Sequence, residues 1–315
     1  MPEVITIGES MAVYAPVRAG RLRYQREYLL GMAGAESNTA IGVQKLGHTA
    51  GWVSLLGEDE LGQFVRNTVR AEGVDTSRVQ LREGARTGLM IKEMTPQETR
   101  VYYYRDGSAF QGIRAEDIDA DYIKSAKIVH LTGITPVLSA SCLRTAKAAA
   151  AIAAQGGAML SFDPNIRRKL WGSADYTAVV TELMNAADIV LVGLDEAQAL
   201  LGVQDAESIA HRLMEEGGAS AVAIKNGKDG AWVADRSGFF HIPPYPCVCI
   251  DPVGAGDAFN AAFLVGLLEK KSIQECGKMG AIAGALATQT IGDTEGLPER
   301  VEMDALLGGT RQIYR

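Results

Sequence analysis

The chain has few cysteines and no long apolar run. Its four cysteines, among 315 residues, include no CxxC pair, and no two histidines stand at metal-ligand spacing. We therefore expect reduced, buried thiols, a cytoplasmic location and no metal site built from protein ligands alone. No apolar stretch reaches about 18 uninterrupted residues, which predicts no transmembrane helix. Residues 1–10 read as a strand without the basic start of a signal peptide.

Two common nucleotide-binding motifs are also missing. The chain contains no GxxxxGK[ST] sequence, so it is not a Walker-A protein, and it lacks a GxGxxG fingerprint, which disfavours a nicotinamide-dependent oxidoreductase. A net charge of −7 argues against a nucleic-acid partner. The composition, 47% hydrophobic and 22% charged, is ordinary for a globular protein with one large α/β core, alone or with a small appendage.

Short apolar runs alternate with amphipathic segments along most of the chain. The runs predict buried strands at Val4–Ile7, Thr49–Leu56, Lys127–Leu131, Ala158–Phe162, Asp188–Val192 and Ala221–Ile224. Helices that stop at glycines are predicted at 61–69, Ser139–Gln155, Asp195–Leu201 and Ala206–Glu216. This alternation predicts a single α/β domain over residues 1–315, with a mainly parallel sheet flanked by helices on both faces.

Two regions break the alternation. Arg21–Leu30 and the pair Thr87–Met94 and Thr99–Tyr104 predict antiparallel strands, and the pair is joined by a hairpin-length turn at Thr95–Glu98. Strands that interrupt the core this early suggest a small sheet standing off the main domain, inserted at about residues 11–32 and 87–110. Such a sheet can act as a lid that excludes water from a site. An ordinary edge hairpin is the alternative.

The strongest local signal is the segment Asp251-Pro-Val-Gly-Ala-Gly-Asp-Ala-Phe259. It precedes an apolar helical run, Ala258–Leu268, so residues 254–257 stand at a helix start. Small residues there give a ligand access to free backbone N–H groups, and the helix dipole attracts phosphate. Asp257 beside this anion site is placed to accept a proton from an attacking hydroxyl group. The alternative is a helix cap and a tight turn with no catalytic role.

Two motifs give the chain a family resemblance. Gly254-Ala-Gly-Asp257 after Asp251-Pro-Val resembles the C-terminal signature of the ribokinase/PfkB carbohydrate kinases. Gly31-Met-Ala-Gly-Ala-Glu-Ser-Asn38 resembles that family's N-terminal glycine-rich substrate motif, and the likeness continues through 57–62 and 72–75. The resemblance implies a ribokinase-like fold, in which an α/β domain carries ATP and a β-sheet lid covers the sugar. It also implies a homo-oligomer formed through the lid.

The resemblance further implies roles for individual residues. Asp257 would be the catalytic base, and the backbone at Gly254, Ala255 and Gly256 would stabilise charge on the transferring phosphoryl group. The ATP-binding residues would be Asn165, Lys225, Asn226, Gly227, Gly230, Gly254 and Gly256. For the loop 225–230 a plain hairpin turn is the alternative. Mg²⁺ would bind mainly through phosphates and water, and a monovalent cation near Asp251 is left open.

Within the family, the chain most resembles 2-keto-3-deoxygluconate kinases. The likeness lies in residues 102–109, 130–136, 163–167 and 292–296. The substrate contacts it implies are Gly34, Asn38, Tyr103, Arg105, Arg167 and Asp293. Arg105 and Arg167 are the residues expected to hold the carboxylate of an acid sugar, because a guanidinium group binds a carboxylate through two parallel hydrogen bonds.

The chain departs from the pattern at three positions. Leu89 stands where these kinases often have a tyrosine that contacts the substrate, and this leaves the exact sugar open. Gly193 and Ala281 replace polar residues near the nucleotide, while the segment 163–165 is shared with fructokinases. The predicted function is ATP-dependent phosphorylation of 2-keto-3-deoxygluconate to the 6-phospho sugar acid. A fructokinase or other PfkB sugar kinase, and a catalytically silent sugar or nucleotide sensor, are the alternatives.

Overall fold

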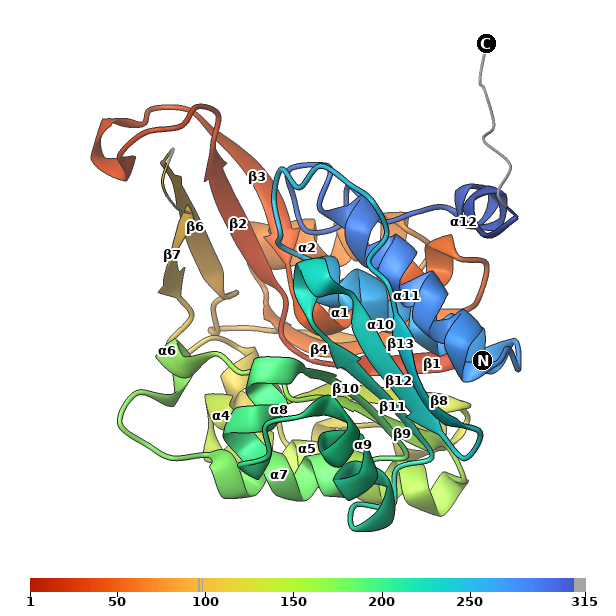
Figure 1. Ribbon diagram of the computed structural model, residues 1–315. Coiled ribbons are helices and arrows are strands. Elements are labelled where there is room, and N and C mark those ends of the chain that lie inside the picture. The colour runs from red at the N-terminus through yellow and green to blue at the C-terminus, as the bar shows by residue number, and fades with distance from the viewer. Residues whose placement is uncertain (96, 98, 309–315) are drawn as a thin grey trace.

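The computed structural model describes residues 1–95, 97 and 99–308, which fold around two β-sheets (Figure 1). The larger sheet has nine strands in the order β13-β12-β11-β10-β9-β8-β1-β4-β5. Their bounds are β1 Val4–Ile7, β4 Ala50–Gly57, β5 Val79–Arg82, β8 Ile128–Thr132, β9 Met159–Asp163, β10 Ile189–Gly193, β11 Ala221–Lys225, β12 Ala231–Asp235 and β13 Gly238–Ile242. In this order, all neighbouring strands from β11 through to β5 pair in parallel. Strand β12 is antiparallel to both β11 and β13. The six predicted core strands are confirmed, with bounds shifted by no more than one residue.

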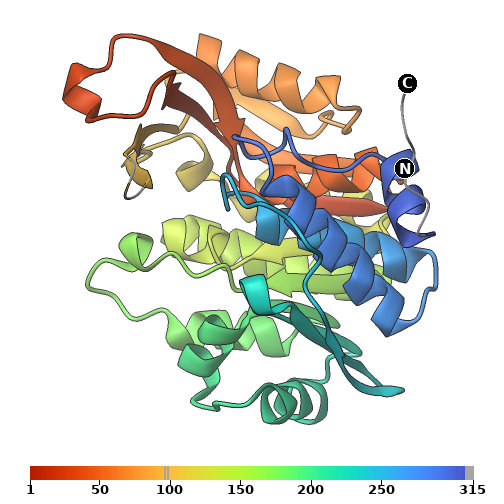
Figure 2. The same cartoon turned by 45° about the horizontal axis from the view of Figure 1, so that its top comes forward.

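Helices cover both faces of the large sheet, as Figures 1 and 2 show. The helices are α1 Ala35–Lys45, α2 Glu60–Ala71, α3 Ala120–Lys124, α4 Thr135–Leu138, α5 Ala140–Gly156, α6 Arg168–Trp171, α7 Thr177–Asn185, α8 Leu194–Leu201, α9 Ala206–Glu215, α10 Ala255–Leu268, α11 Ile273–Ala287 and α12 Arg300–Leu307. Alternate strand residues point to opposite faces, so Val4 belongs to the core cluster that includes α1, α10 and α11, while Ile5 belongs to the cluster that includes α5 and α7 to α9. This double burial explains why the strands are continuously apolar rather than alternating.

The predicted helix ends are confirmed where glycine follows the helix. Gly157 and Gly202 have φ values of +76° and +68° and cap α5 and α8 in the left-handed conformation. This region is unfavourable for residues with a side chain, so the glycines stop the helices there. Ser139 caps the other end of α5, where its side chain accepts a hydrogen bond from the backbone N–H of Cys142.

The smaller sheet is the predicted lid. Its four strands, in the order β3-β2-β6-β7, are β2 Met11–Pro16, β3 Tyr28–Ala33, β6 Leu89–Met94 and β7 Thr99–Tyr104. Strands β2 and β6 are parallel, and the other two pairings are antiparallel. The sheet projects from the upper left of the molecule in Figures 1 and 2, apart from the large sheet. It is therefore a separate sheet rather than an edge hairpin of the core.

One lid prediction needs correction. The segment Arg21–Leu30 is not one strand, because Leu22–Tyr24 forms a 3₁₀ turn and β3 begins only at Tyr28. The backbone N–H of Leu22 donates to the Glu93 carboxylate of β6, at 2.8 Å, so a long-range contact ties this segment to the sheet as a tip. The hairpin of β6 and β7 is confirmed. Two residues of its predicted turn, 96 and 98, lie outside the described residues.

The structure also bears on the predictions that the thiols are buried and that the chain has no transmembrane helix. Cys142 and Cys276 are buried as expected, but Cys247 and Cys249 are exposed, because they lie in the extended segment after β13. All four are free thiols. Within the described part of the chain, no helix combines the length and the apolar character needed to cross a membrane.

Candidate active site

The start of α10 forms an open, glycine-rich loop. Gly254 caps the helix with φ +79°, and a Cβ atom there would collide with the backbone carbonyl of Asp293. At Gly256 an added Cβ would meet only the Lys225 ammonium, 3.8 Å away. No side chain among the described residues caps this helix start. The N–H of Ala255 makes only a long hydrogen bond of 3.4 Å to the carbonyl of Pro252, so this helix start still offers backbone N–H groups to an anion, as the sequence predicts for residues 254–257.

Asp257 lies in the first turn of α10 and is buried, with 9% of its surface exposed. The side-chain amide of Asn38 donates a hydrogen bond of 2.8 Å to its Oδ2. Burial raises the pKa of Asp257 to about 7, and the charges of Asp163 and Asp293 add to this, against the opposing effects of Asn38 and Arg167. A carboxylate with a pKa near neutrality suits a general base.

Helix α1 brings the glycine-rich motif 31–38 against Asp257. Asn38 is buried, and its Oδ1 atom has no hydrogen-bond partner within the described residues. A buried acceptor of this kind is normally satisfied, so it is suited to a hydroxyl group of a bound sugar. Gly34 caps the same helix, and a Cβ there would clash with Ser10 and with the backbone of Glu9. The backbone of Gly34 therefore packs closely where the lid strands join the core.

A second buried carboxyl group belongs to the same motif. Glu36 accepts hydrogen bonds from Thr132 at 2.7 Å and from Thr135 at 3.2 Å. Burial raises its pKa to about 7, because two hydroxyl groups replace water only in part. Glu36 was not among the predicted site residues, although its place inside the glycine-rich motif 31–38 is a visible signal.

The ends of β9 and β11 supply a charged network. Lys225 contacts Asp163 at 2.7 Å and Asn260 at 3.1 Å, and Asn260 also donates to Asp163 at 2.6 Å. Burial alone would raise the pKa of Asp163, but the Lys225 ammonium and the amide hold it below its usual value. Asn165 adopts a positive φ of 39°, and its N–H donates to Asp163. Strained backbone of this kind is often found at functional sites.

These residues line a polar cavity of about 370 Å³. Its lining comprises Asp163, Asn165, Arg167, Glu196, Lys225, Pro252, Val253, Gly254, Gly256 and Asp257. An apolar cavity of about 540 Å³ shares Lys225, Pro252 and Gly256 with it and extends along residues 227–230, 244–249 and 281–288. The two adjoining cavities fit a nucleoside beside its phosphates. Of the predicted nucleotide residues, Asn226 lines neither cavity, and its N–H instead closes the loop by donating to Gly230.

Glu196 is a cavity residue that the sequence analysis missed. It accepts hydrogen bonds from the backbone N–H groups of Ile166, at 2.6 Å, and Gly193, at 3.0 Å. Burial raises its pKa, and the Asp163 charge adds to the effect. The signal for Glu196 in the sequence is an acidic residue in the first turn of α8, after a core strand.

Ala281, one of the positions that depart from the family pattern, lines the apolar cavity.

The structure separates the two arginines predicted to hold a carboxylate. Arg105 is buried and donates from both Nε, at 3.0 Å, and Nη2 to Glu9 of the protein itself. Ser108 completes this cluster with a bond of 2.6 Å to Glu9, and the ring of Tyr103 lies 5.8 Å from the Arg105 guanidinium group. Arg167, in contrast, is exposed, lines the polar cavity and forms no ion pair with a described residue.

The lid also reaches the late loop that follows α11. Lys92 of β6 forms a buried ion pair of 3.0 Å with Asp293. Lys92 lies on the same face of β6 as Met90, which pairs with Tyr103 in the register. Leu89 lies on the opposite face and packs against the main core. The position of the missing tyrosine is therefore directed away from Lys92 and Tyr103.

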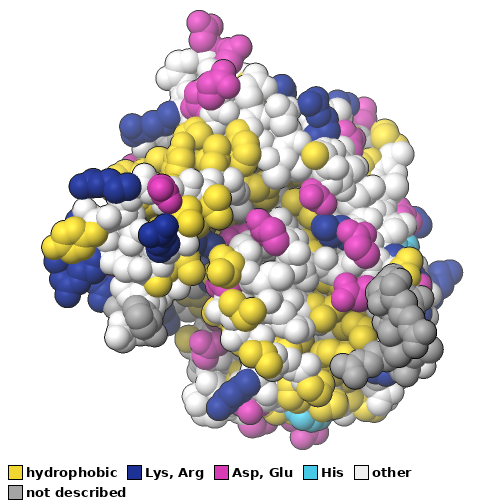
Figure 3. All heavy atoms as spheres, turned by 90° about the horizontal axis from the view of Figure 1, so that it is seen from above, with side chains coloured by type: hydrophobic (Ala, Val, Ile, Leu, Met, Phe, Trp, Pro, Cys, Tyr) yellow, Lys and Arg dark blue, Asp and Glu magenta, His cyan; other side chains and the backbone are white. Residues whose placement is uncertain are grey.

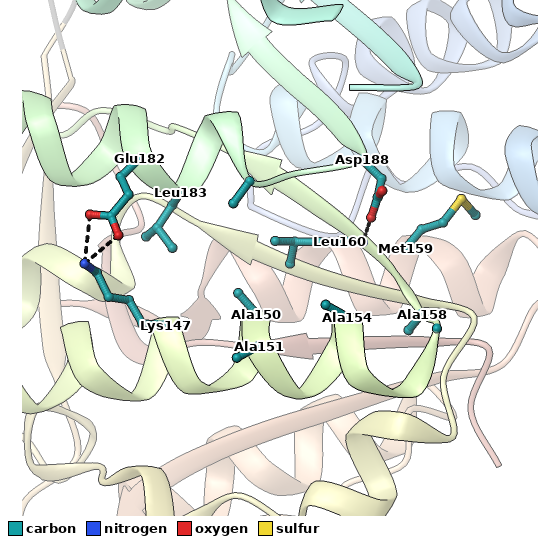
Figure 4. A pocket seen from close by; sticks show the side chains of 12 residues that line it. Lys147, Ala150, Ala151, Ala154, Ala158, Met159, Leu160, Glu182, Leu183 and Asp188 are labelled. Atoms are coloured by element: carbon teal, nitrogen blue, oxygen red, sulfur yellow. Dashed lines mark hydrogen bonds and ion pairs between the residues drawn. The ribbon is translucent and has the colours of Figure 1, made fainter. Parts of the chain in front are cut away.

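A further hollow of about 560 Å³ lies between α5 and α7, away from this site (Figure 4). Alanines form much of its lining, and an ion pair of 2.7 Å between Lys147 and Glu182 crosses one end. None of the residues that line it belongs to the predicted site.

Comparison with known proteins gives matches over the whole length. The model of the pfkB family of carbohydrate kinases matches residues 1–300. The chain is 35% identical over 318 residues to a 2-dehydro-3-deoxygluconokinase of Bacillus subtilis, covering 99% of this chain and 98% of that protein. It is 33% identical to a 2-dehydro-3-deoxygluconokinase of Thermoproteus tenax, covering 98% of this chain and 94% of that protein. It is 30% identical to fructokinase-1 of Zea mays, covering 96% of this chain and 97% of that protein. 2-Dehydro-3-deoxygluconate is another name for 2-keto-3-deoxygluconate.

Solved structures give the same fold. A 2-dehydro-3-deoxygluconokinase from Thermotoga maritima superimposes with a TM-score of 0.90 at 25% identity, covering 97% of this chain and 98% of that one. A fructokinase from Vibrio cholerae, solved with fructose, ADP and a potassium ion, has a TM-score of 0.86 at 25% identity, with 98% of each chain covered.

Proposed function

The chain belongs to the pfkB family of carbohydrate kinases and is an ATP-dependent sugar kinase; we propose that its sugar is 2-keto-3-deoxygluconate. The product would be the 6-phospho sugar acid and ADP. The observation that carries the kinase chemistry is the position of Asp257, a buried carboxylate in the first turn of the helix whose open start faces both cavities. The two relatives at 33–35% identity support the choice of sugar.

In the proposed reaction Asp257 is the general base. Its carboxylate takes the proton of the acceptor hydroxyl while the hydroxyl oxygen bonds to the γ-phosphorus of ATP and the bond to the leaving ADP oxygen breaks. The N–H groups at Gly254, Ala255 and Gly256 would stabilise the negative charge of the transferring phosphoryl group, with the Ala255 N–H giving up its 3.4 Å hydrogen bond to the carbonyl of Pro252. Asn38 orients Asp257 through its amide and offers its free Oδ1 to the sugar.

An acid sugar suits the distribution of charge around the site. Three of its basic side chains are already neutralised by carboxylates: Arg105 by Glu9, Lys92 by Asp293 and Lys225 by Asp163. Arg167 is the basic side chain that remains available in the polar cavity. We therefore assign the sugar carboxylate to Arg167, and we assign to Arg105 the ordering of the lid beside Tyr103.

ATP and its metal ion would occupy the two cavities together. The adenosine would lie in the apolar cavity beside residues 227–230, with its phosphates over residues 254–256. Mg²⁺ would arrive with the phosphates and neutralise part of their charge, since no group of three or more acidic, histidine or cysteine side chains in the described chain could hold a metal ion by itself. A monovalent cation near Asp251 is part of the proposal, and potassium dependence of the rate tests it.

The lid would also join two subunits. Its outer side exposes Leu30 at 38%, Tyr102 at 39% and Tyr104 at 57%. The view from above shows hydrophobic side chains exposed among basic ones at the lid end of the molecule (Figure 3). An apolar face of this kind is normally covered, and a second copy of the lid is the simplest partner. A cytoplasmic location completes the proposal and suits the two exposed free thiols.

A coupled ATP-consumption assay across 2-keto-3-deoxygluconate, fructose, ribose and gluconate tests the choice of sugar. We expect the highest kcat/KM with 2-keto-3-deoxygluconate. A higher kcat/KM with fructose would make the protein a fructokinase. Turnover of none of the sugars, with ATP still bound in calorimetry, would favour a silent sensor on the same fold.

A further inference from the structure

The ion pair between Lys92 and Asp293 is the buried connection of the lid to the late loop. The two side chains are only 4% and 8% exposed, and their charged atoms lie 3.0 Å apart. Lys92 belongs to a lid strand, whereas Asp293 follows α11, more than two hundred positions later. A buried lysine is costly unless a carboxylate pairs with it. The lid therefore loses a favourable contact for each charge if it moves away from the loop.

Asp293 is also in contact with the phosphate-binding part of the site. Its backbone carbonyl lies directly against Gly254, where even a Cβ atom would not fit. Gly254 in turn has the left-handed conformation that starts α10. A shift of the Asp293 backbone would therefore displace the residue that sets the direction of the first N–H groups of the helix.

The Asp293 carboxylate is linked to the catalytic base as well. Asn38 interacts with Asp293 through its side chain and donates to Asp257 at 2.8 Å. The negative charges of Asp293 and Asp257 repel each other, and this repulsion contributes to the raised pKa of Asp257. The Lys92 ammonium offsets this repulsion at the moment when the lid covers the site.

We propose that Lys92 is a positioning residue that couples the closed lid to the phosphate-binding loop through Asp293. With the lid closed, Lys92 holds Asp293, and Asp293 holds Gly254, in the arrangement that phosphoryl transfer requires. With the lid open, Asp293 is released and the loop loses this support. Closure over the sugar and completion of the anion site are then one event. This coupling protects the phosphoryl group from attack by water while the lid is open. The inference rests on the proposed kinase function.

The test compares four variants of the full-length protein: Lys92→Met, Lys92→Arg, Asp293→Asn and the double variant Lys92→Met/Asp293→Asn. Lys92→Met should lower kcat at saturating ATP and sugar by about tenfold or more, with a smaller change in the KM for ATP, and Lys92→Arg should restore most of the loss. The double variant should lose little more than Lys92→Met alone, because both changes break one coupling. Lys147→Met, which breaks an exposed ion pair with Glu182 in the distant groove, is the matched control and should leave kcat unchanged.

Hydrogen exchange gives a readout that does not depend on turnover. In Lys92→Met the amides of β6, β7 and the segment 289–298 should exchange faster together, while those of α5 should not change. If the loss of kcat in the double variant equals the product of the losses in the two single variants, Lys92 and Asp293 act independently and the coupling is overturned. A loss seen with acid sugars alone would also overturn it and would make Lys92 a carboxylate ligand. If the wild-type protein phosphorylates no sugar, the proposed function fails, while faster exchange confined to the lid and the loop still supports the coupling.

Discussion

The side-chain amide of Asn38 lies 2.8 Å from Oδ2 of Asp257, although 219 positions separate the two residues. Each residue belongs to one of the two glycine-rich motifs of the sequence, and helices α1 and α10 bring them together beneath the lid. The contact orients the Asp257 carboxylate, and it leaves Oδ1 of Asn38 without a partner in the described chain. The two glycine-rich motifs thus meet through this hydrogen bond.

Removal of the proposed base is the first prediction. Asp257→Asn keeps the shape of the side chain but cannot accept the hydroxyl proton, so kcat should fall by at least about a hundredfold, with ATP affinity nearly unchanged. Asp205→Asn at the start of α9 is a suitable control, because asparagine caps a helix as well as aspartate does. Near wild-type turnover in Asp257→Asn would show that another group takes the proton.

The pH dependence of the rate follows from the same residue. Burial raises the pKa of Asp257 to about 7, so its carboxylate is protonated, and unable to act as a base, below that pH. We expect kcat/KM to fall about tenfold per pH unit below neutrality and to level off above it. A profile that stays flat between pH 5 and 8 would contradict this role.

Stability should vary with pH in the opposite direction to activity. A carboxyl group whose pKa is raised in the folded state favours folding while it is protonated, and this contribution is lost as the pH rises through about 7. Asp257→Asn and Glu36→Gln should therefore each raise Tm at pH 8. The corresponding gain in the free energy of unfolding should be roughly 1 to 4 kcal/mol. The gain should shrink toward pH 5 in thermal scans. A gain independent of pH would point to packing instead.

The two arginines should differ in selectivity. Arg167→Ala should raise the KM for 2-keto-3-deoxygluconate by about 10- to 150-fold, the equivalent of one charge-assisted hydrogen bond, and change the fructose KM much less. Arg105→Ala should reduce activity on both sugars, because it leaves Glu9 buried without its cation. Steady-state kinetics on both sugars checks this. If Arg105→Ala loses activity on the acid sugar alone, Arg105 is the residue that binds the sugar carboxylate.

The lid interface can be tested in solution. Sedimentation should show a dimer at micromolar concentration, and Tyr104→Glu, which charges the exposed lid face, should shift it toward monomer. Glu302→Lys on the exposed face of α12 is a control for a change of charge elsewhere. A strict monomer in the wild-type protein would count against the lid–lid dimer.

Local pattern and short motifs determined much of this protein. The apolar runs defined all six predicted core strands to within one residue, because strands buried on both faces leave an unbroken apolar signal. Glycines marked the helix ends for the same local reason, since only they readily adopt the left-handed cap. The two signatures placed Asn38 and Asp257 in one site and indicated a sugar kinase before any contact was known.

Contacts between distant segments were decided only by the tertiary structure. The sequence shows Arg105 and Lys92 as single charges in a lid strand or beside it, and nothing local identifies Glu9 and Asp293 as their partners. The 3₁₀ tip at Leu22–Tyr24 depends on Glu93 in the same way, and the exposure of Cys247 and Cys249 depends on the path of the chain after β13. Burial and ion pairing are properties of the assembled fold. They raise the pKa of Asp257 toward neutrality and leave Arg167 as the basic side chain available to an acid sugar.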